Sequence, residues 1–183
     1  MREIRAPLTE EVVAQLRSGD AVRISGVLYV ARDAAHKRMV DGLQRGEGLP
    51  FEALGQIVYY MGPSPERPGN PTGSAGPTTS GRMDLYSVPM LAAGIKGMLG
   101  KGSRSLAVRQ ALQEYRAVYL AMTGGVAALI AQGIQKAEVI AYEDLGPEAL
   151  RRLRVVDLPA IVINDVYGED AYEEGRATYR LKD

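Results

Sequence analysis

Hydrophobic and polar positions follow two different periods along this chain. Six short stretches are rich in valine, isoleucine, leucine or tyrosine, and the clearest of them shows partial two-residue alternation. Such stretches are typical of β-strands, and we predict strands over 21–30, 56–61, 95–99, 117–122, 137–142 and 158–164. Between them, apolar residues recur every three or four positions, which predicts helices. We expect helices that begin near residues 9, 33 and 80, helices over 103–115 and 127–132, and a helical turn over 147–152.

Strand and helix therefore alternate at short intervals, which indicates the α/β class with some parallel sheet. Thr9 and Asp33 precede helical patterns and are expected to be N-caps. Residues 62–80 are too dense in proline and glycine for a helix or a central strand, and we interpret them as a long functional loop. We expect a single domain over 1–168, followed by a polar and flexible tail over 169–183.

Composition narrows the classes of function. The 22 basic and 22 acidic side chains give a net charge of zero, which argues against a general nucleic-acid-binding surface. The chain has no cysteine, so it has no disulfide, no zinc–thiolate site and no iron–sulfur cluster held by its own thiolates. Because it also has a single histidine, we expect no metal site in this chain. No stretch approaches the ~18 apolar residues of a membrane span. The N-terminus lacks the apolar stretch of a signal peptide, so we expect a cytoplasmic protein.

Two segments carry candidate anion-binding chemistry. Residues 76–84 place hydroxyls at a predicted helix start, and Arg82 lies four residues after Thr78, where its planar guanidinium suits a carboxylate. An ordinary N-cap beside a solvated arginine explains that segment equally well. Residues 100–105 lie between a predicted strand and a predicted helix, where open α/β sheets bind ligands, and Lys101 adds a positive charge. An ordinary basic turn is the alternative there. We favour a functional site at residues 100–105, because the end of a predicted strand, a glycine, a lysine and the start of a predicted helix coincide there.

Two further segments are less specific. His36 lies three residues after Asp33, so the two share a helix face and form a plausible acid–base pair. Judged from the residues alone, a surface histidine beside a capping aspartate is the simpler interpretation. Residues 123–128 form a turn of small residues that would admit a ligand or a partner's backbone, although close packing is the simpler explanation. The chain lacks a Walker A motif, a dinucleotide-binding fingerprint and the Gly-x-Ser-x-Gly elbow of serine hydrolases.

Five segments occur in one order at consistent separations. They are Ala-Arg-Asp-Ala-Ala-His-Lys-Arg at 31–38, Tyr-Tyr-Met-Gly-Pro at 59–63, Gly-Pro-Thr-Thr-Ser-Gly-Arg-Met-Asp at 76–84, Gly-Lys-Gly-Ser-Arg-Ser at 100–105 and Thr-Gly-Gly-Val-Ala-Ala-Leu at 123–129. The set resembles the C-terminal domain of class I fumarases and the β subunit of their two-chain forms, over about residues 8–168. The resemblance implies a swivelling β/β/α fold, with a mixed sheet and flanking helices.

The resemblance also implies a function. It implies a hydro-lyase that reversibly hydrates fumarate to (S)-malate, a reaction of the tricarboxylic acid cycle, with this chain as the β subunit of a heteromer. It implies a 4Fe–4S cluster held by cysteines of a partner α subunit, and two copies of each chain. The fourth iron of that cluster would bind the substrate as a Lewis acid. Carried over by position, the expected catalytic residues are Thr78 and His36, and the expected residues for binding the dicarboxylate are Arg82, Lys101, Thr79 and Arg104.

Close relatives in this family act on other acids. The L-tartrate dehydratase β subunit shares the Ala-Arg-Asp and Gly-Pro-Thr-Thr-Ser segments, but its pattern has Met-Arg-Met-Glu where this sequence has Gly-Arg-Met-Asp at 81–84. Because this chain has the fumarase form there and over 103–105, we favour fumarate over tartrate or a methylated fumarate such as mesaconate. A non-catalytic module that senses a dicarboxylate with the same pocket is the remaining alternative.

Overall fold

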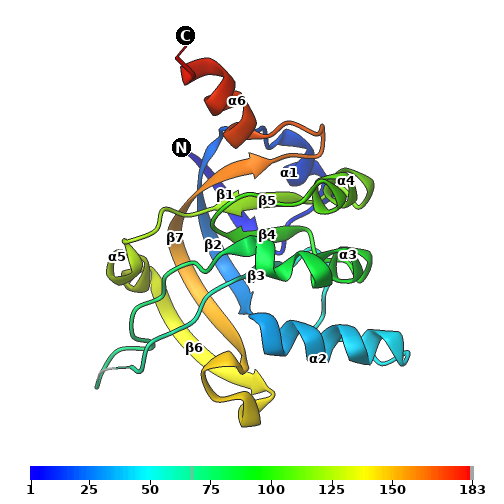
Figure 1. Ribbon diagram of the computed structural model, residues 1–183. Helices are drawn as coiled ribbons and strands as arrows, with labels where there is room; N and C mark the ends of the chain where they lie inside the picture. Colours follow the sequence, from blue (N-terminus) through cyan, green and yellow to red (C-terminus); the bar gives the residue numbers. More distant parts are fainter. Residues whose placement is uncertain (67, 182–183) are drawn as a thin grey trace.

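The computed structural model describes residues 1–66 and 68–181. Arg67 belongs to the predicted 62–80 loop, and Lys182 and Asp183 to the predicted tail, so these parts of the two predictions lie outside the described residues. Within the described part, the strands form one sheet and helices surround it (Figure 1). The strands are β1 (Arg2–Ala6), β2 (Ala21–Val30), β3 (Ile57–Tyr59), β4 (Gly97–Gly100), β5 (Val118–Ala121), β6 (Ile134–Ala141) and β7 (Leu150–Asn164). The α-helices are α1 (Glu10–Gln15), α2 (Asp33–Gln44), α3 (Asp84–Ala92), α4 (Leu106–Glu114), α5 (Ala127–Gln132) and α6 (Ala171–Tyr179). The 3₁₀ helices are η1 (Ser80–Met83) and η2 (Glu143–Glu148).

The sheet closes on itself. Strands β2, β3, β4 and β5 are parallel neighbours in that order, and β7 runs antiparallel to both β5 and β2. Strand β1 pairs with β2, and β6 pairs with β7, so both extend the ring formed by the other five. The long seam between β2 and β7 runs from the pair Ala21–Ile161 to the pair Val30–Arg151. Closure of this kind leaves few unpaired backbone groups at the sheet's edges.

Two apolar cores lie on the two faces of the strands. Side chains alternate between the faces, so Ile57 and Tyr59 belong to the core inside the ring, while Val58 and Tyr60 belong to the core under the helices. Helices α2, α3 and α4 lie side by side over this second core, and α5 lies on the opposite side of the molecule (Figure 1). The predicted α/β class, with a mixed sheet flanked by helices, is confirmed.

Several local predictions correspond closely to the structure. The strands predicted over 21–30 and 117–122 are β2 and β5, and the helix predicted over 127–132 is α5. Thr9 is the N-cap of α1 as predicted, because its side chain accepts a hydrogen bond from the Val12 N–H. The prediction for Asp33 is wrong: Arg32 has the extended backbone of the N-cap, and Asp33 is the first residue of α2.

Three segments depart from the sequence-based prediction. The helical turn expected over 147–152 is instead η2, which ends at Glu148. Strand β7 begins at Leu150, because Leu153 and Val155 are buried in the core inside the ring and belong to this strand. Strand β1 was not predicted, since only Ile4 and Ala6 of its residues are buried. Helix α6 lies within the segment for which the sequence predicts a flexible tail, and Asp170 caps its first turn.

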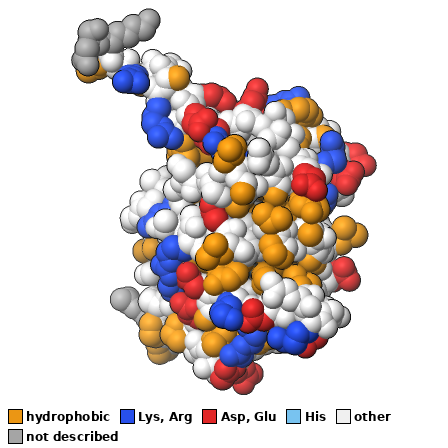
Figure 2. Space-filling model, turned by 45° about the vertical axis from the view of Figure 1, so that its right-hand side comes forward, with side chains coloured by type: hydrophobic (Ala, Val, Ile, Leu, Met, Phe, Trp, Pro, Cys, Tyr) orange, Lys and Arg blue, Asp and Glu red, His pale blue; other side chains and the backbone are white. Residues whose placement is uncertain are grey.

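The outer surface of the helical layer is partly apolar. Figure 2 shows hydrophobic side chains gathered over α3 and α4, where Leu85, Val88 and Leu106 are exposed. Charged side chains predominate below this apolar area in the same view. Arg38 of α2 and Asp144 of η2 form an exposed ion pair. None of the helices in the described ranges combines the length and apolar character required to cross a membrane.

Candidate active site

The predicted anion-binding segments lie at one end of the parallel strands. Arg32 follows β2, Tyr60 follows β3, Lys101 follows β4 and Thr123 follows β5. Because these four strands are parallel neighbours, their carboxyl ends lie along the same edge of the sheet. Ligands of α/β proteins bind at this edge. The fold therefore joins segments that are far apart in the sequence into one candidate site.

Thr78 joins this edge through its backbone. Its N–H donates to the Tyr60 carbonyl with 2.7 Å between nitrogen and oxygen, and its carbonyl accepts from the Lys101 N–H at 3.2 Å. The Ser80 N–H donates to the Lys101 carbonyl at 2.8 Å, so this segment lies alongside the end of β4. Thr79 is exposed and Thr78 is half-buried. The structure thus brings together Thr78, Thr79 and Lys101, three of the residues predicted from the sequence.

Gly100 makes this close contact possible. A side chain at that position would overlap Ser80 Oγ and would lie 2.9 Å from Tyr60 Cδ2. The buried hydroxyl of Tyr119 accepts a hydrogen bond from Ser80 Oγ at 2.9 Å and donates one to the Gly102 carbonyl at 2.8 Å. The loop after β4 is therefore fixed by backbone hydrogen bonds on one side and by a buried tyrosine on the other.

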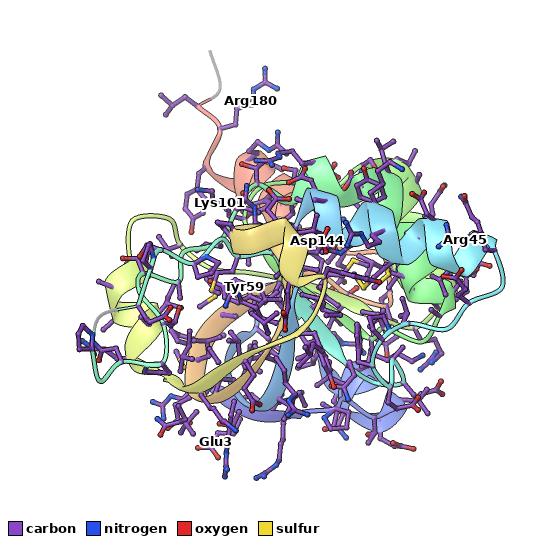
Figure 3. All side chains as sticks on the ribbon, turned by 90° about the horizontal axis from the view of Figure 1, so that it is seen from below. Glu3, Arg45, Tyr59, Lys101, Asp144 and Arg180 are labelled. Carbon is purple, nitrogen blue, oxygen red and sulfur yellow. The ribbon has the colours of Figure 1, made fainter. Side chains whose placement is uncertain are left out.

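The Lys101 side chain lies over the turn after β5. A Cβ added at Gly124 would lie 3.8 Å from Lys101 Nζ, and the glycine leaves that space open. Among the residues described, no acidic side chain forms an ion pair with Lys101. Figure 3 shows Lys101 at the rim of the molecule and Tyr59 among the strands in the interior. Lys101 is half-buried, and an ammonium without a carboxylate partner among the described residues suits an anionic ligand.

Arg82 reaches the start of α2 and pairs with Asp33. Its Nε lies 3.1 Å from Asp33 Oδ1, and its Nη2 donates to Oδ2. Burial raises the pKa of Asp33, but the hydrogen bonds from Arg82 and from the backbone, together with the charges of Arg82 and Arg32, lower this pKa by more, so the carboxylate stays ionised. The pairing leaves Nη1 of Arg82 for a further anion. Asp33 therefore pairs with Arg82 and not with His36, the partner that the sequence predicted.

Arg32 is a candidate that the sequence analysis missed. Its Nη2 lies 3.4 Å from Glu148 Oε1, and its guanidinium approaches Gly62 so closely that any side chain at Gly62 would overlap it. Its buried Nε has no hydrogen-bond partner among the described residues. Arg32 and Arg82 thus bring two guanidiniums to the start of α2. The signal in the sequence is its position two residues after the strand predicted over 21–30, at the ligand-binding edge of a parallel sheet.

His36 lies in the core beneath the site. It is 1% exposed, and its ring meets that of Tyr60 edge-on, with 5.3 Å between the ring centres. Its Nδ1 lies 2.9 Å from the Arg32 carbonyl, which can only accept a hydrogen bond, so this nitrogen carries the proton. Burial lowers the pKa of His36 to about 4, and the ring is therefore neutral at pH 7. These contacts favour a role in supporting Arg32 and Tyr60 over the catalytic role predicted for His36.

Burial of His36 is expected to destabilise the protein in mild acid. An unfolded histidine titrates near pH 6.5, so between pH 6.5 and about 4 the unfolded chain binds a proton that the folded chain excludes. The free energy of unfolding should fall as the pH is lowered through this window, by about 3 kcal/mol in total. Urea unfolding between about pH 7 and pH 4 measures the decrease, and His36→Asn should remove most of it. An equally steep decrease in the variant would assign the effect to other groups.

Arg104 faces the interior. Its side chain is fully buried, its Nε lies 2.8 Å from Asp84 Oδ1, and its Nη2 donates to Ser87 Oγ. Its guanidinium carbon lies 5.0 Å from the centre of the Tyr119 ring, a favourable cation–aromatic contact. Because these donors are directed at α3, the substrate contact predicted for Arg104 does not fit its placement. Arg104 instead joins α3 to the start of α4.

Comparison with known proteins assigns the family. The sequence model described as "Fumarase C-terminus" matches residues 2–175. The chain belongs to the fumarase C-terminal family. It is 38% identical over 180 residues to "Fumarate hydratase class I, aerobic" of Escherichia coli (strain K12), an alignment that covers 97% of this chain and 32% of that protein. It is 42% identical over 153 residues to "Fumarate hydratase 1, mitochondrial" of Leishmania major, which covers 82% of this chain and 28% of that protein.

A third relative in this family has a similar length. The chain is 36% identical over 173 residues to "Putative L(+)-tartrate dehydratase subunit beta" of Methanocaldococcus jannaschii, which covers 91% of this chain and 89% of that protein. By contrast, the chain spans only about a third of the fumarate hydratases that it matches. The recognition of the fumarase family from the sequence is confirmed.

In the ranges that the structure describes, no three histidine, cysteine, aspartate or glutamate side chains gather in an arrangement that would hold an ion. The sequence contains no cysteine. A cluster ligated by thiolates therefore does not fit the residues of this chain.

Proposed function

We propose that this chain is the β subunit of a two-subunit hydro-lyase that reversibly hydrates fumarate to (S)-malate. The observation that carries the proposal is the placement of Thr78 beside Lys101, which has no ion-pair partner within residues 1–66 and 68–181, at a sheet edge that also holds Arg32 and Arg82. Membership of the fumarase C-terminal family makes hydration of a dicarboxylate the first reaction to consider for such a site.

The three cations suit a dicarboxylate. Fumarate carries one carboxylate at each end of a planar double bond, so its binding requires positive charge at two places. Arg82 retains Nη1 beyond its pair with Asp33, and the Arg32 side chain, paired with Glu148, stays 24% exposed. Lys101 adds a compact ammonium. We assign the two guanidiniums to one carboxylate and Lys101 to the other. The guanidiniums of Arg32 and Arg82 both reach the start of α2, whereas Lys101 follows β4 and is bonded to Thr78 through its backbone.

Thr78 supplies a hydroxyl at the same edge. Hydration adds a hydroxyl to one carbon of the double bond and a proton to the other, and dehydration removes both. A threonine hydroxyl is a weak base at neutral pH, so proton transfer through it requires nearby positive charge to stabilise the alkoxide. Lys101, whose backbone N–H is bonded to the Thr78 carbonyl, is the cation that we assign to this task. The proton is then held and released at Thr78 Oγ.

A partner chain completes the proposed enzyme. This chain has no cysteine, so we place a 4Fe–4S cluster on cysteines of a separate α subunit and assign none of its ligands here. A relative of similar length whose name includes "subunit beta" supports the two-chain arrangement. We propose two copies of each chain and a cytoplasmic complex that serves the tricarboxylic acid cycle.

Dehydration of tartrate is the second candidate. It is favoured by the Methanocaldococcus jannaschii relative, whose name specifies L(+)-tartrate and whose identity of 36% is close to the 38% of the Escherichia coli fumarate hydratase. Tartrate carries two hydroxyls that fumarate lacks, so a site built for it would need additional hydrogen-bonding groups. Among the described residues near Thr78, the hydroxyl of Thr79 is exposed at the site edge.

The ratio of kcat/KM between acids tests the substrate. The complex of this chain with a cysteine-bearing partner, reconstituted anaerobically, is assayed with fumarate, L-tartrate and mesaconate under identical conditions. We expect fumarate to exceed tartrate by about 100-fold, since a site that offers only the Thr79 hydroxyl leaves at least one of the two tartrate hydroxyls unpaired. A kcat/KM that is highest for tartrate or mesaconate would replace the fumarate assignment and retain the hydro-lyase.

A further inference from the structure

Glu148 binds two parts of the candidate site at once. Its Oε2 accepts a hydrogen bond from the Ala34 N–H at 2.9 Å, and its Oε1 lies 3.4 Å from Arg32 Nη2. The Ala34 N–H belongs to the first turn of α2, where a helix has free donors and a partial positive charge. One carboxylate thus connects the start of α2 to the guanidinium of Arg32, although Glu148 is more than 100 residues away in the sequence.

The η2 segment is shaped to present this carboxylate. Gly146 has φ 54° and ψ −117°, a conformation open to glycine and strained for other residues. The Ala149 N–H closes the turn on the Gly146 carbonyl at 3.0 Å. A second ion pair docks η2 farther along α2, where both Nη atoms of Arg38 lie 2.7 Å from the Asp144 carboxylate oxygens. The η2 segment is therefore attached to α2 at two separate points.

Arg32 is confined between Glu148 and the chain after β3. Its Nη1 side lies against Gly62, whose missing side chain provides the space, and its Nη2 side faces Glu148. About a quarter of the side chain, 24%, remains exposed, and the buried Nε still lacks a hydrogen-bond partner in the described part of the chain. An arginine held on two sides can accept a planar anion without first losing side-chain freedom.

We propose that Glu148 is a positioning residue that holds Arg32 in the orientation required to bind a carboxylate of the substrate. Together with Asp33, which holds Arg82, it gives each of the two arginines an acidic side chain as its anchor. The inference rests on the proposed function for the identity of the carboxylate. It extends that function by making the β6–β7 connection part of the substrate-binding apparatus.

The test compares Glu148→Gln with Asp144→Asn in the reconstituted complex. Both variants replace an η2 carboxylate that contacts α2, but only Glu148 touches Arg32. We expect Glu148→Gln to raise KM for fumarate about tenfold with kcat within about twofold, because binding is weakened and the reacting groups are unchanged. Asp144→Asn should leave both constants unchanged. Equal effects of the two variants, or a fall in kcat without a rise in KM, would overturn the positioning role.

A measurement on the chain by itself separates this inference from the proposed function. NMR order parameters of the Arg32 Nε–H bond report the mobility of the guanidinium without any assay of activity. We expect this order parameter to fall clearly in Glu148→Gln and to stay at the wild-type value in Asp144→Asn. If the wild-type complex were inactive with every acid, the proposed function would fail, and this result would still decide whether Glu148 holds Arg32. An unchanged order parameter in Glu148→Gln would refute the role.

Discussion

Replacing Thr78 by alanine in the reconstituted complex is expected to lower kcat for fumarate hydration by about 10²- to 10⁴-fold, the range typical for loss of a group that transfers a proton. In the described structure, Thr78 contributes only its backbone N–H and carbonyl to hydrogen bonds. Its side chain can therefore be removed without disturbing the contacts to Tyr60 and Lys101, and the melting temperature should change little.

Two further variants make this prediction specific. Thr178→Ala removes the same atoms from an exposed position in α6, far along the chain from the candidate site, and should leave kcat unchanged. Thr78→Ser retains a hydroxyl and should retain most of the activity. If Thr78→Ala kept more than about a tenth of the wild-type kcat, proton transfer would have to be assigned to a different group.

Replacing Arg104 by alanine is expected to lower the free energy of unfolding by about 3–5 kcal/mol, since it removes one partner of a buried charged pair. Asp84, 16% exposed in its side chain, would keep only its hydrogen bond from the Ser105 N–H, and Ser87 would lose its charged partner. Urea unfolding of the chain by itself measures this loss.

The matched control is Arg45→Ala. Arg45 forms an equally direct pair with Glu47, but both side chains are more than half exposed, so its loss should leave the free energy of unfolding almost unchanged. The sequence alone predicts that Arg104 binds the substrate. An Arg104→Ala chain that unfolds like the wild type, with a raised KM in the complex, would restore that prediction and contradict the structural role assigned here.

Local structure was largely predictable from the sequence because it depends on neighbouring residues. The alternation in residues 21–30 identified β2, and the small-residue turn before residue 127 placed α5 correctly. Closure of the sheet was not predictable, because alternation shows which face of a strand is buried but not which strand pairs with it. The seam between β2 and β7 joins residues about 130 positions apart, and no local pattern specifies that pairing.

The candidate site was predictable in its location and less so in its individual side chains. Thr78 and Lys101 were identified by hydroxyl, glycine and lysine positions at element ends, and the backbone does bring them together. The partners of a charged side chain are often distant in the sequence. The sequence therefore did not show that Arg104 forms a buried ion pair with Asp84, or that Arg82 pairs with Asp33. Arg32 was passed over because a single arginine after a strand is a weak signal until Gly62 and Glu148 are seen beside it.

The central claim is that this chain provides one half of a hydro-lyase site. The most direct test is anaerobic hydration of fumarate, followed by loss of fumarate absorbance, with the chain alone, with a cysteine-bearing partner alone, and with both after iron–sulfur reconstitution. The account predicts malate formation in the mixture only. Hydration of fumarate by this chain alone would contradict it, because the chain would then contain a complete site. A fully loaded mixture that converts none of fumarate, tartrate or mesaconate would contradict the hydro-lyase assignment itself.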